Sequence, residues 1–218
     1  MVTKTLRTAG QRAGLSRGDI VAAALGYIDE HGLGALSMHK LGAVLDVKGM
    51  SLYNHVAGKD DLLDGVVDLL WQEIAAAAPA QADWRLGFRA LARAIRDVML
   101  RHPNAAPLMT TQRVMPQSAL RTVLAHVTSA TGAGLPEPRA YDLLRAVSST
   151  ALGTTLADLT WGTGQQGCAP DISDLLRPGT PDELVAAAEI FCGQSCPDAQ
   201  FALALDLMLR PDDHEPPQ

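Results

Sequence analysis

Residues 36–60 have the sequence LSMHKLGAVLDVKGMSLYNHVAGKD, and this stretch decides the fold. Ser37 suits the N-cap of a short helix that we expect to reach Leu45, and Asp46 marks the tight turn that follows. Residues 49–54 then predict a third helix of barely two turns. Helices this short are not stable alone, so they need the preceding and following helices as packing partners.

The N-terminal partner is a helix that the sequence predicts to begin after Ser16 and to end at Gly32. Asp19 lies three residues beyond Ser16, close to a capping-box arrangement, and Gly32 suits the left-handed position after a helix. One face of this helix is apolar at helical spacing. The expected core of the three-helix unit consists of Ile20, Ala24, Ile28, Leu36, Leu41, Leu45, Val47, Leu52 and Val56.

The third segment of this unit keeps a polar surface. It is apolar only at Met50, Leu52 and Val56, which leaves the hydrogen-bonding side chains between them to face outward. A helix-turn-helix needs this arrangement, because its second helix projects polar side chains into the major groove of DNA. The outward-facing residues are Lys48, Ser51, Tyr53, Asn54 and His55.

The rest of the chain also predicts helices, so the expected fold class is all-α with about nine to ten helices. Of the 218 residues 47 % are hydrophobic, with Ala and Leu dominant, and no strand pattern emerges. A long helix opens at Gly58-Lys59-Asp60, and a second unit follows Pro79. Its expected helices cover residues 84–101, 117–131, 139–160, 181–192 and 198–209, with a long loop over 162–180.

We expect a helix-turn-helix domain over residues 1–59, in which 1–15 form a flexible basic arm. A ligand-binding and dimerisation domain would follow over 60–210, with a disordered tail over 211–218. Residues 1–59 carry seven Lys or Arg against four Asp or Glu, whereas the remainder carries 11 against 20. This asymmetry predicts an anionic partner for the N-terminal part, although charge alone does not separate nucleic acid from a membrane surface. No apolar run is long enough to span a bilayer, and we expect a cytoplasmic protein without a membrane partner.

At these motifs the sequence resembles the tetracycline-repressor (TetR) family of regulators. The resemblance rests on IVAAALGYIDEHG in the first helix, on LSM at the start of the second, on LDV in the turn, and on SLYNHV followed by GKDDLL. The chain departs from the family pattern at Asp46, where Gly is common, and at Gly42, where Ala is usual. Asp tolerates the left-handed conformation better than most residues, and Gly permits close helix packing.

The resemblance implies roles for residues of the helix-turn-helix. Phosphate contacts would come from Ser37, Lys40, Tyr53 and Lys59. The residues facing the major groove would be His39, Lys48, Gly49, Met50, Ser51 and Asn54, with His55 packing or touching the DNA backbone. Tyr53 and His55 are also compatible with plain packing inside the domain.

The C-terminal part resembles the branch that contains the tetracycline repressors themselves, which implies a small-molecule pocket among its helices. The candidate pocket residues are Trp71, Phe88, Met99, His102, Met109, Gln112, Arg113, Met115, Leu124, Ser148 and Trp161. Ordinary core packing is the alternative for the Met, Trp and Phe residues. Arg113 stands out, because a charged residue among apolar neighbours needs a partner. Met109 falls where tetracycline repressors present a metal-binding His, which argues against a tetracycline–magnesium effector, and no metal or cofactor is expected.

The expected function is therefore a repressor that a small hydrophobic ligand releases from double-stranded operator DNA. A recognition helix of two turns binds weakly alone, which predicts a homodimer, with helices 139–160 and 198–209 at its interface. A TetR-like activator or a ligand-independent DNA binder remains an alternative. A helical enzyme is a remote one, because the six histidines are scattered and no nucleophile elbow is present.

Overall fold

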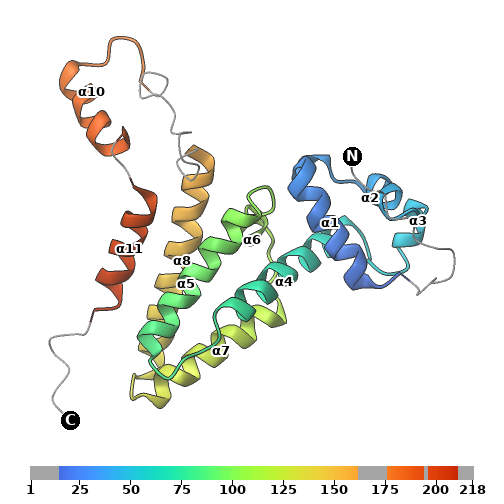
Figure 1. Cartoon of the computed structure of the whole chain (residues 1–218), viewed down its shortest axis with the longest axis horizontal. Coiled ribbons are helices and arrows are strands. Elements are labelled where there is room, and N and C mark those ends of the chain that lie inside the picture. Colours follow the sequence, from blue (N-terminus) through green and yellow to red (C-terminus); the bar gives the residue numbers. More distant parts are fainter. Residues whose placement is uncertain (1–14, 162–175, 194–195, 211–218) are drawn as a thin grey trace, which may run out of the picture.

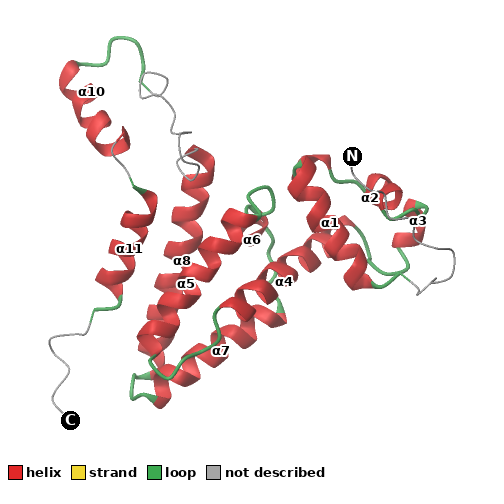
Figure 2. Ribbon diagram, in the orientation of Figure 1, coloured by secondary structure: helices red, strands yellow, loops and turns green. Residues whose placement is uncertain are grey.

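The computed structural model describes residues 15–161, 176–193 and 196–210, and the ordered elements of these ranges are all helical (Figures 1 and 2). This confirms the all-α prediction. The predicted arm before Leu15, the tail over 211–218 and most of the predicted loop over 162–180 lie outside the described residues. The helices are α1 (Arg17–His31), η1 (Leu33–Ala35), α2 (Met38–Val44), α3 (Gly49–Leu52), α4 (Lys59–Ala77), α5 (Trp84–Arg101), α6 (Leu108–Thr111), α7 (Gln117–Gly132), α8 (Glu137–Trp161), α10 (Asp182–Ala188), η2 (Glu189–Gly193) and α11 (Pro197–Met208).

The start of α1 is fixed by a capping box at Ser16. The Ser16 hydroxyl accepts a hydrogen bond from the Asp19 amide at 3.2 Å, and the Asp19 carboxylate accepts one from the Ser16 amide at 3.0 Å. These reciprocal bonds satisfy amides that have no partner within the helix. Gly32 ends the helix at φ 81°, a left-handed value that favours glycine.

The helices α1 to α3 form the head, whose core is the predicted one. Ile20, Ile28, Leu41 and Leu52 are fully buried there, whereas Leu45 and Val47 are only half-buried. Asp46 adopts φ 55° in the turn between α2 and α3. α3 ends at Leu52, one half-turn earlier than predicted, because residues 53–55 continue as hydrogen-bonded turns.

The helices α4 to α11 form the body. Figure 1 shows α4 leaving the head and continuing into the body, where it packs against α5 and α7. Because α4 crosses from one part to the other without a break, the domain boundary at residue 59 stays a prediction. α5 lies along α8, and α11 packs against α8 and forms ion pairs with α5. Among the residues that the structure describes, no helix is both long and apolar enough to cross a membrane.

A buried arginine joins three helices of the body. Arg96 of α5 is 5 % exposed. It donates to Asp158 of α8 at 2.6 Å and to Asp198 of α11 at 2.9 Å. The Thr155 hydroxyl of α8 lies 3.5 Å from its Nη1 atom, and its guanidinium stacks 5.4 Å from the Phe201 ring centre. These contacts hold α11 against α8 and α5.

Candidate nucleic-acid interface and ligand groove

Two glycines set the spacing of α2 and α3. A Cβ atom on Gly42 would lie 2.8 Å from the Gly49 nitrogen and 2.9 Å from the Val47 carbonyl oxygen. A Cβ atom on Gly49 would lie 3.1 Å from the Met38 carbonyl oxygen. The start of α3 therefore packs on the backbone of α2, which accounts for Gly42 at a position where the sequence resemblance led us to expect Ala.

This packing leaves a polar surface on the head. Most of the predicted DNA-contacting side chains are exposed, and even the apolar Met50 is 76 % exposed. Ser37, Gly49 and Ser51 are half-buried. The exposed members are His39, Lys40, Lys48, Met50, Tyr53, Asn54, His55 and Lys59. Tyr53 and His55 thus lie on the surface rather than in the head core.

Two of the predicted phosphate-binding lysines converge at the start of α2. The Lys40 ammonium donates to the Ala35 carbonyl at 3.0 Å, and the Lys59 ammonium donates to the adjacent Leu36 carbonyl at 2.9 Å. The Ser37 hydroxyl caps the same helix end by accepting from the Lys40 amide at 3.3 Å. Each ammonium has three donors. These bonds therefore fix two positive charges beside α2 while leaving donors for another group.

The predicted ligand-binding residues differ widely in burial. Phe88 and Met99 are completely buried in the body core, whereas Met115 and Leu124 are about 60 % exposed. The half-buried members are Trp71, His102, Met109, Gln112 and Ser148. The side chain of Trp161 lies outside the described residues.

The sequence argument for Arg113 is wrong in its premise. Arg113 is exposed to solvent, so its charge needs no compensating partner. The arginine that does lie among apolar neighbours is Arg96, which the sequence analysis missed. Arg96 is one of five arginines in α5, and the sequence gives no sign that it is the buried one, because its carboxylate partners lie 62 and 102 residues away.

His102 connects the head with the body instead of lining a described cavity. Its Nδ1 atom lies 2.8 Å from the Asp29 carboxylate of α1, and its Nε2 atom lies 3.4 Å from the Glu73 carboxylate of α4. Asn104 adds a bond of 2.9 Å from its side-chain amide to the Asp29 carbonyl. These contacts link the end of α5 to α1.

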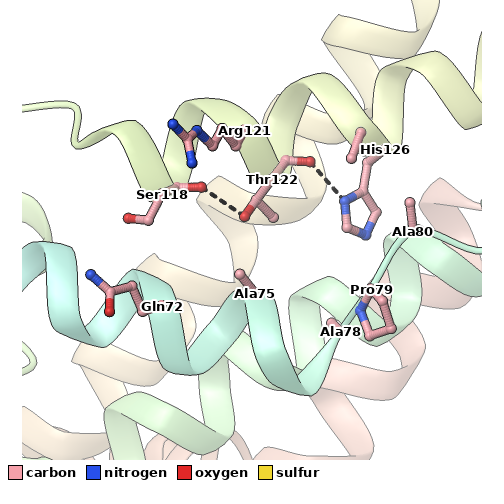
Figure 3. Close-up of a pocket in the computed structure, with 10 residues that line it drawn as sticks. Gln72, Ala75, Ala78, Pro79, Ala80, Ser118, Arg121, Thr122 and His126 are labelled. Atoms are coloured by element: carbon pink, nitrogen blue, oxygen red, sulfur yellow. Dashed lines mark hydrogen bonds between the residues drawn. The ribbon is translucent and has the colours of Figure 1, made fainter.

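A groove of about 440 Å³ lies between α4 and α7 and is lined by residues that the sequence analysis did not select (Figure 3). Its apolar part comes from alanines and a proline near the end of α4. Its polar part comes mainly from α7. The lining residues are Gln72, Ala75, Ala78, Pro79, Ala80, Ser118, Arg121, Thr122, Ala125 and His126. None of the predicted ligand-binding residues is among them.

His126 is the most deeply buried polar residue of this groove, at 2 % exposure. Its Nδ1 atom donates to the Thr122 carbonyl at 2.8 Å, whereas its Nε2 atom has no hydrogen-bond partner among the described residues. Burial lowers the pKa of the His126 imidazole below its ordinary value, which keeps the ring neutral at pH 7. A single His in a helix carries no spacing signal, so sequence patterns could not have selected it.

A second cavity of about 270 Å³ lies between α5 and α11, beside Arg96, Asp198 and Phe201. It also contains none of the predicted ligand-binding residues. The part of the chain that the structure describes holds no group of three or more His, Cys, Asp or Glu side chains placed to bind a metal ion.

Comparison with known families now decides the identity. The model of the tetracyclin repressor-like C-terminal domain matches residues 77–210. The chain belongs to the TetR family. This result confirms the resemblance that the helix-turn-helix motifs carried.

Curated relatives are named as HTH-type transcriptional regulators, which agrees with this assignment. An HTH-type transcriptional regulator of Saccharopolyspora erythraea is 37 % identical over 106 residues, which are 49 % of this chain and 45 % of the relative. The chain spans about half the length of the curated relatives it matches. The family and these relatives are transcriptional regulators, which are not enzymes.

Solved structures of TetR proteins have the same fold. ActR of Streptomyces coelicolor in complex with actinorhodin superposes with a TM-score of 0.73 at 26 % identity, covering 90 % of this chain and 96 % of ActR. BioQ with its double-stranded DNA operator superposes with a TM-score of 0.57 at 30 % identity, covering 67 % of this chain and 89 % of BioQ.

Proposed function

We propose that this TetR-family chain is a cytoplasmic DNA-binding transcriptional repressor that acts as a homodimer and leaves its operator when it binds a small apolar molecule. The observation that carries the proposal is the surface of the head. A short helix with exposed polar side chains stands beside two lysines held at the start of α2. The structure of BioQ with its operator supports a DNA-binding role for a head of this fold.

In this proposal α3 enters the major groove. Lys48, Ser51 and Asn54 carry the donors and acceptors that read base edges there, with Met50 offering an apolar contact. Lys40 and Lys59 lie farther along the surface and supply positive charge to the phosphates, which positions the head without reading sequence. His39 and Gly49 also face the major groove of the DNA. The remaining contacts with the DNA backbone come from Ser37, Tyr53 and His55.

The dimer would form through α8 and α11. Leu203 and Leu207 of α11 are each 56 % exposed, although α11 packs on α8 with its other face. Exposed leucines four residues apart form an apolar stripe on a helix, which a second copy would cover. Two heads joined in this way would contact half-sites about one helical turn of DNA apart.

The effect of a bound ligand would reach the head through the helices that join head and body. α4 begins at Lys59 in the head and continues to the groove at Ala75. The contact between His102 and Asp29 attaches α1 to the end of α5. A ligand that favours a wider separation of the two heads weakens operator binding by the difference of its affinities for the two states. The complex of ActR with actinorhodin supports small-molecule binding by a body of this fold.

Fluorescence anisotropy tests the proposal with labelled DNA from the region flanking the gene and with random DNA of equal length. We expect the wild-type chain to prefer the flanking DNA. The variant Asn54→Ala should lose about 1–3 kcal/mol of that preference, because it removes a base contact. Tyr53→Ala and Lys59→Ala should weaken binding to both DNAs, because they remove phosphate contacts, and Lys59→Ala should also flatten the salt dependence, because it removes a positive charge.

The matched control is Arg177→Ala, which removes an exposed positive charge from the segment before α10 in the body. It should leave both affinities unchanged. Equal affinity of the wild type for both DNAs at every salt concentration would contradict the proposal. An activator would use the same contacts, and transcription in vitro distinguishes the two, because a repressor lowers transcript from the bound promoter.

A further inference from the structure

The segment between α3 and α4 carries three of the proposed DNA contacts, Tyr53, Asn54 and His55. It covers residues 53–58 and lies outside both helices. Its first half is held by α3, because the His55 amide donates to the Leu52 carbonyl at 2.9 Å. Its second half has to be held from α4 and α1, the helices on which the head is mounted.

The side chain that holds it is Asp61, in the first turn of α4. One oxygen of its carboxylate accepts a hydrogen bond from the Ala57 amide at 2.8 Å. The other accepts one at 2.5 Å from the guanidinium of Arg17, the first residue of α1. The same guanidinium donates to the Asp61 carbonyl at 3.2 Å. We call the bonds from the Asp61 carboxylate to Ala57 and Arg17 the Asp61 bridge. It joins the segment after α3 to α1.

α1 and α4 pack closely where this bridge lies (Figure 1). A Cβ atom on Gly65, one turn beyond Asp61, would lie 2.7 Å from a methyl carbon of Val21 and 3.2 Å from the Arg17 guanidinium. The close crossing keeps the Arg17 side chain beside the start of α4. The bond from the Ala57 amide, followed by the bond from Arg17, holds the pKa of the Asp61 carboxyl below its ordinary value, so the bridge is charged at pH 7.

The charge of Asp61 by itself would oppose DNA binding. Asp61 follows the proposed phosphate contact Lys59 by two residues, and a carboxylate near phosphates repels them. Its removal should therefore strengthen binding to any DNA, and the release of Arg17 from its pair should add further attraction. A loss of binding after removal of Asp61 would have to come from geometry, because the change of charge acts in the other direction.

We propose that Asp61 is a positioning residue for sequence-selective DNA binding, because the Asp61 bridge fixes the segment after α3 on α1 and so sets the orientation of α3 in the major groove. The bridge acts through the residues that it holds. Base reading depends on it more than phosphate attraction does, since hydrogen bonds to bases need narrow geometry whereas charges attract over about 10 Å. The inference rests on the proposed function.

Fluorescence anisotropy with flanking and random DNA compares Asp61→Asn with Asp60→Asn. Both variants remove one negative charge at neighbouring positions, but Asp60 is exposed and its side chain bonds to no other residue that the structure describes. On random DNA both variants should bind about twofold more tightly than the wild type. On flanking DNA Asp60→Asn should again bind more tightly, whereas Asp61→Asn should bind about fivefold more weakly, the value of one ordinary hydrogen bond.

Arg17→Met tests the connection to α1. It should lower the preference for flanking over random DNA in the wild-type background and change that preference little in the Asp61→Asn background, because the two residues act through one bridge. Asp61→Glu retains the charge and the acceptor oxygens, so it should recover part of the preference that Asp61→Asn loses. Titration of each variant to saturation with DNA gives its active fraction, which separates a changed affinity from partial unfolding.

Hydrogen exchange of the Ala57 amide, followed by NMR on the full chain without DNA, measures the bridge directly. This amide should exchange at least about fivefold faster in Asp61→Asn than in the wild type, because it loses its charged acceptor. In Asp60→Asn its exchange should be unchanged.

Tighter binding of Asp61→Asn to both DNAs, a preference equal to that of the wild type, or unchanged exchange of the Ala57 amide would each overturn the inference. These results differ from a failure of the proposed function. A selective wild type with an equally selective Asp61→Asn refutes the positioning role alone, whereas a wild type without preference for the flanking DNA refutes the proposed function and the inference with it.

Discussion

Removal of the Asp158 carboxylate is the most informative perturbation of the body. Arg96 is buried, and it is paired with Asp158, whose side chain is 15 % exposed, and with Asp198, whose side chain is 86 % exposed. In Asp158→Ala the guanidinium keeps only the exposed carboxylate of Asp198, whose charge water and salt screen. A buried ion pair that loses one member destabilises a protein by about 3–5 kcal/mol.

A solvent-exposed ion pair on the same helix provides a comparison for this loss of stability. Asp142 of α8 pairs with Arg145 at 3.0 Å, and both side chains are largely exposed. Such surface pairs contribute at most about 1 kcal/mol. Asp158→Ala should therefore lower the free energy of unfolding at least about threefold more than Asp142→Ala, and should lower Tm by about 10 °C.

Urea unfolding followed by far-ultraviolet circular dichroism measures both variants. The double variant Arg96→Met/Asp158→Leu should recover most of the lost stability, because apolar residues of similar volume replace buried pairs at little cost. Equal losses in Asp158→Ala and Asp142→Ala would refute the reasoning that Arg96 is a buried charge compensated by Asp158.

Three further predictions concern single residues. Burial lowers the pKa of His126, so the unfolded chain binds a proton before the folded chain does as the pH falls below about 6.5. The free energy of unfolding should then decrease by up to about 1.4 kcal/mol per pH unit. Urea unfolding at pH 7.5 and 5.5 should show a smaller decrease for His126→Phe than for the wild type, and an equal decrease would contradict this prediction. Ser16→Ala removes the capping box with Asp19 and should cost about 1 kcal/mol in the same assay, whereas no loss would mean that the cap contributes nothing to stability. Asp46→Val places a β-branched residue at φ 55° and should cost about 1–2 kcal/mol, whereas Asp46→Gly should be neutral or stabilising; the reverse order would contradict a left-handed turn.

The fold was predictable because local signals agreed with one another. Ser16 and Ser37 each cap the helix that the sequence assigned to them, and each accepts a hydrogen bond from a backbone amide of the first turn. The head core followed from apolar spacing in α1 and from the short segments around Leu41 and Leu52. Such signals act over three or four residues, which is the range that sequence patterns cover well.

The groove between α4 and α7 was not predictable in this way, because its lining depends on packing between distant helices. Phe88 and Met99 are large apolar residues of the kind that often line pockets, yet both side chains point from α5 into the body core. His126 and Thr122 have no distinctive spacing, and their position opposite Ala75 arises only when α7 packs on α4. The same reason explains why Arg113 was selected and Arg96 was missed.

Footprinting of the DNA that flanks the gene tests the central claim most directly. The account predicts that the wild-type chain protects two half-sites of related sequence about one helical turn apart, and that Asn54→Ala loses this protection while Arg177→Ala keeps it. Absence of any protected sequence, or protection that Asn54→Ala leaves unchanged, would contradict the assignment of α3 as the DNA-reading helix.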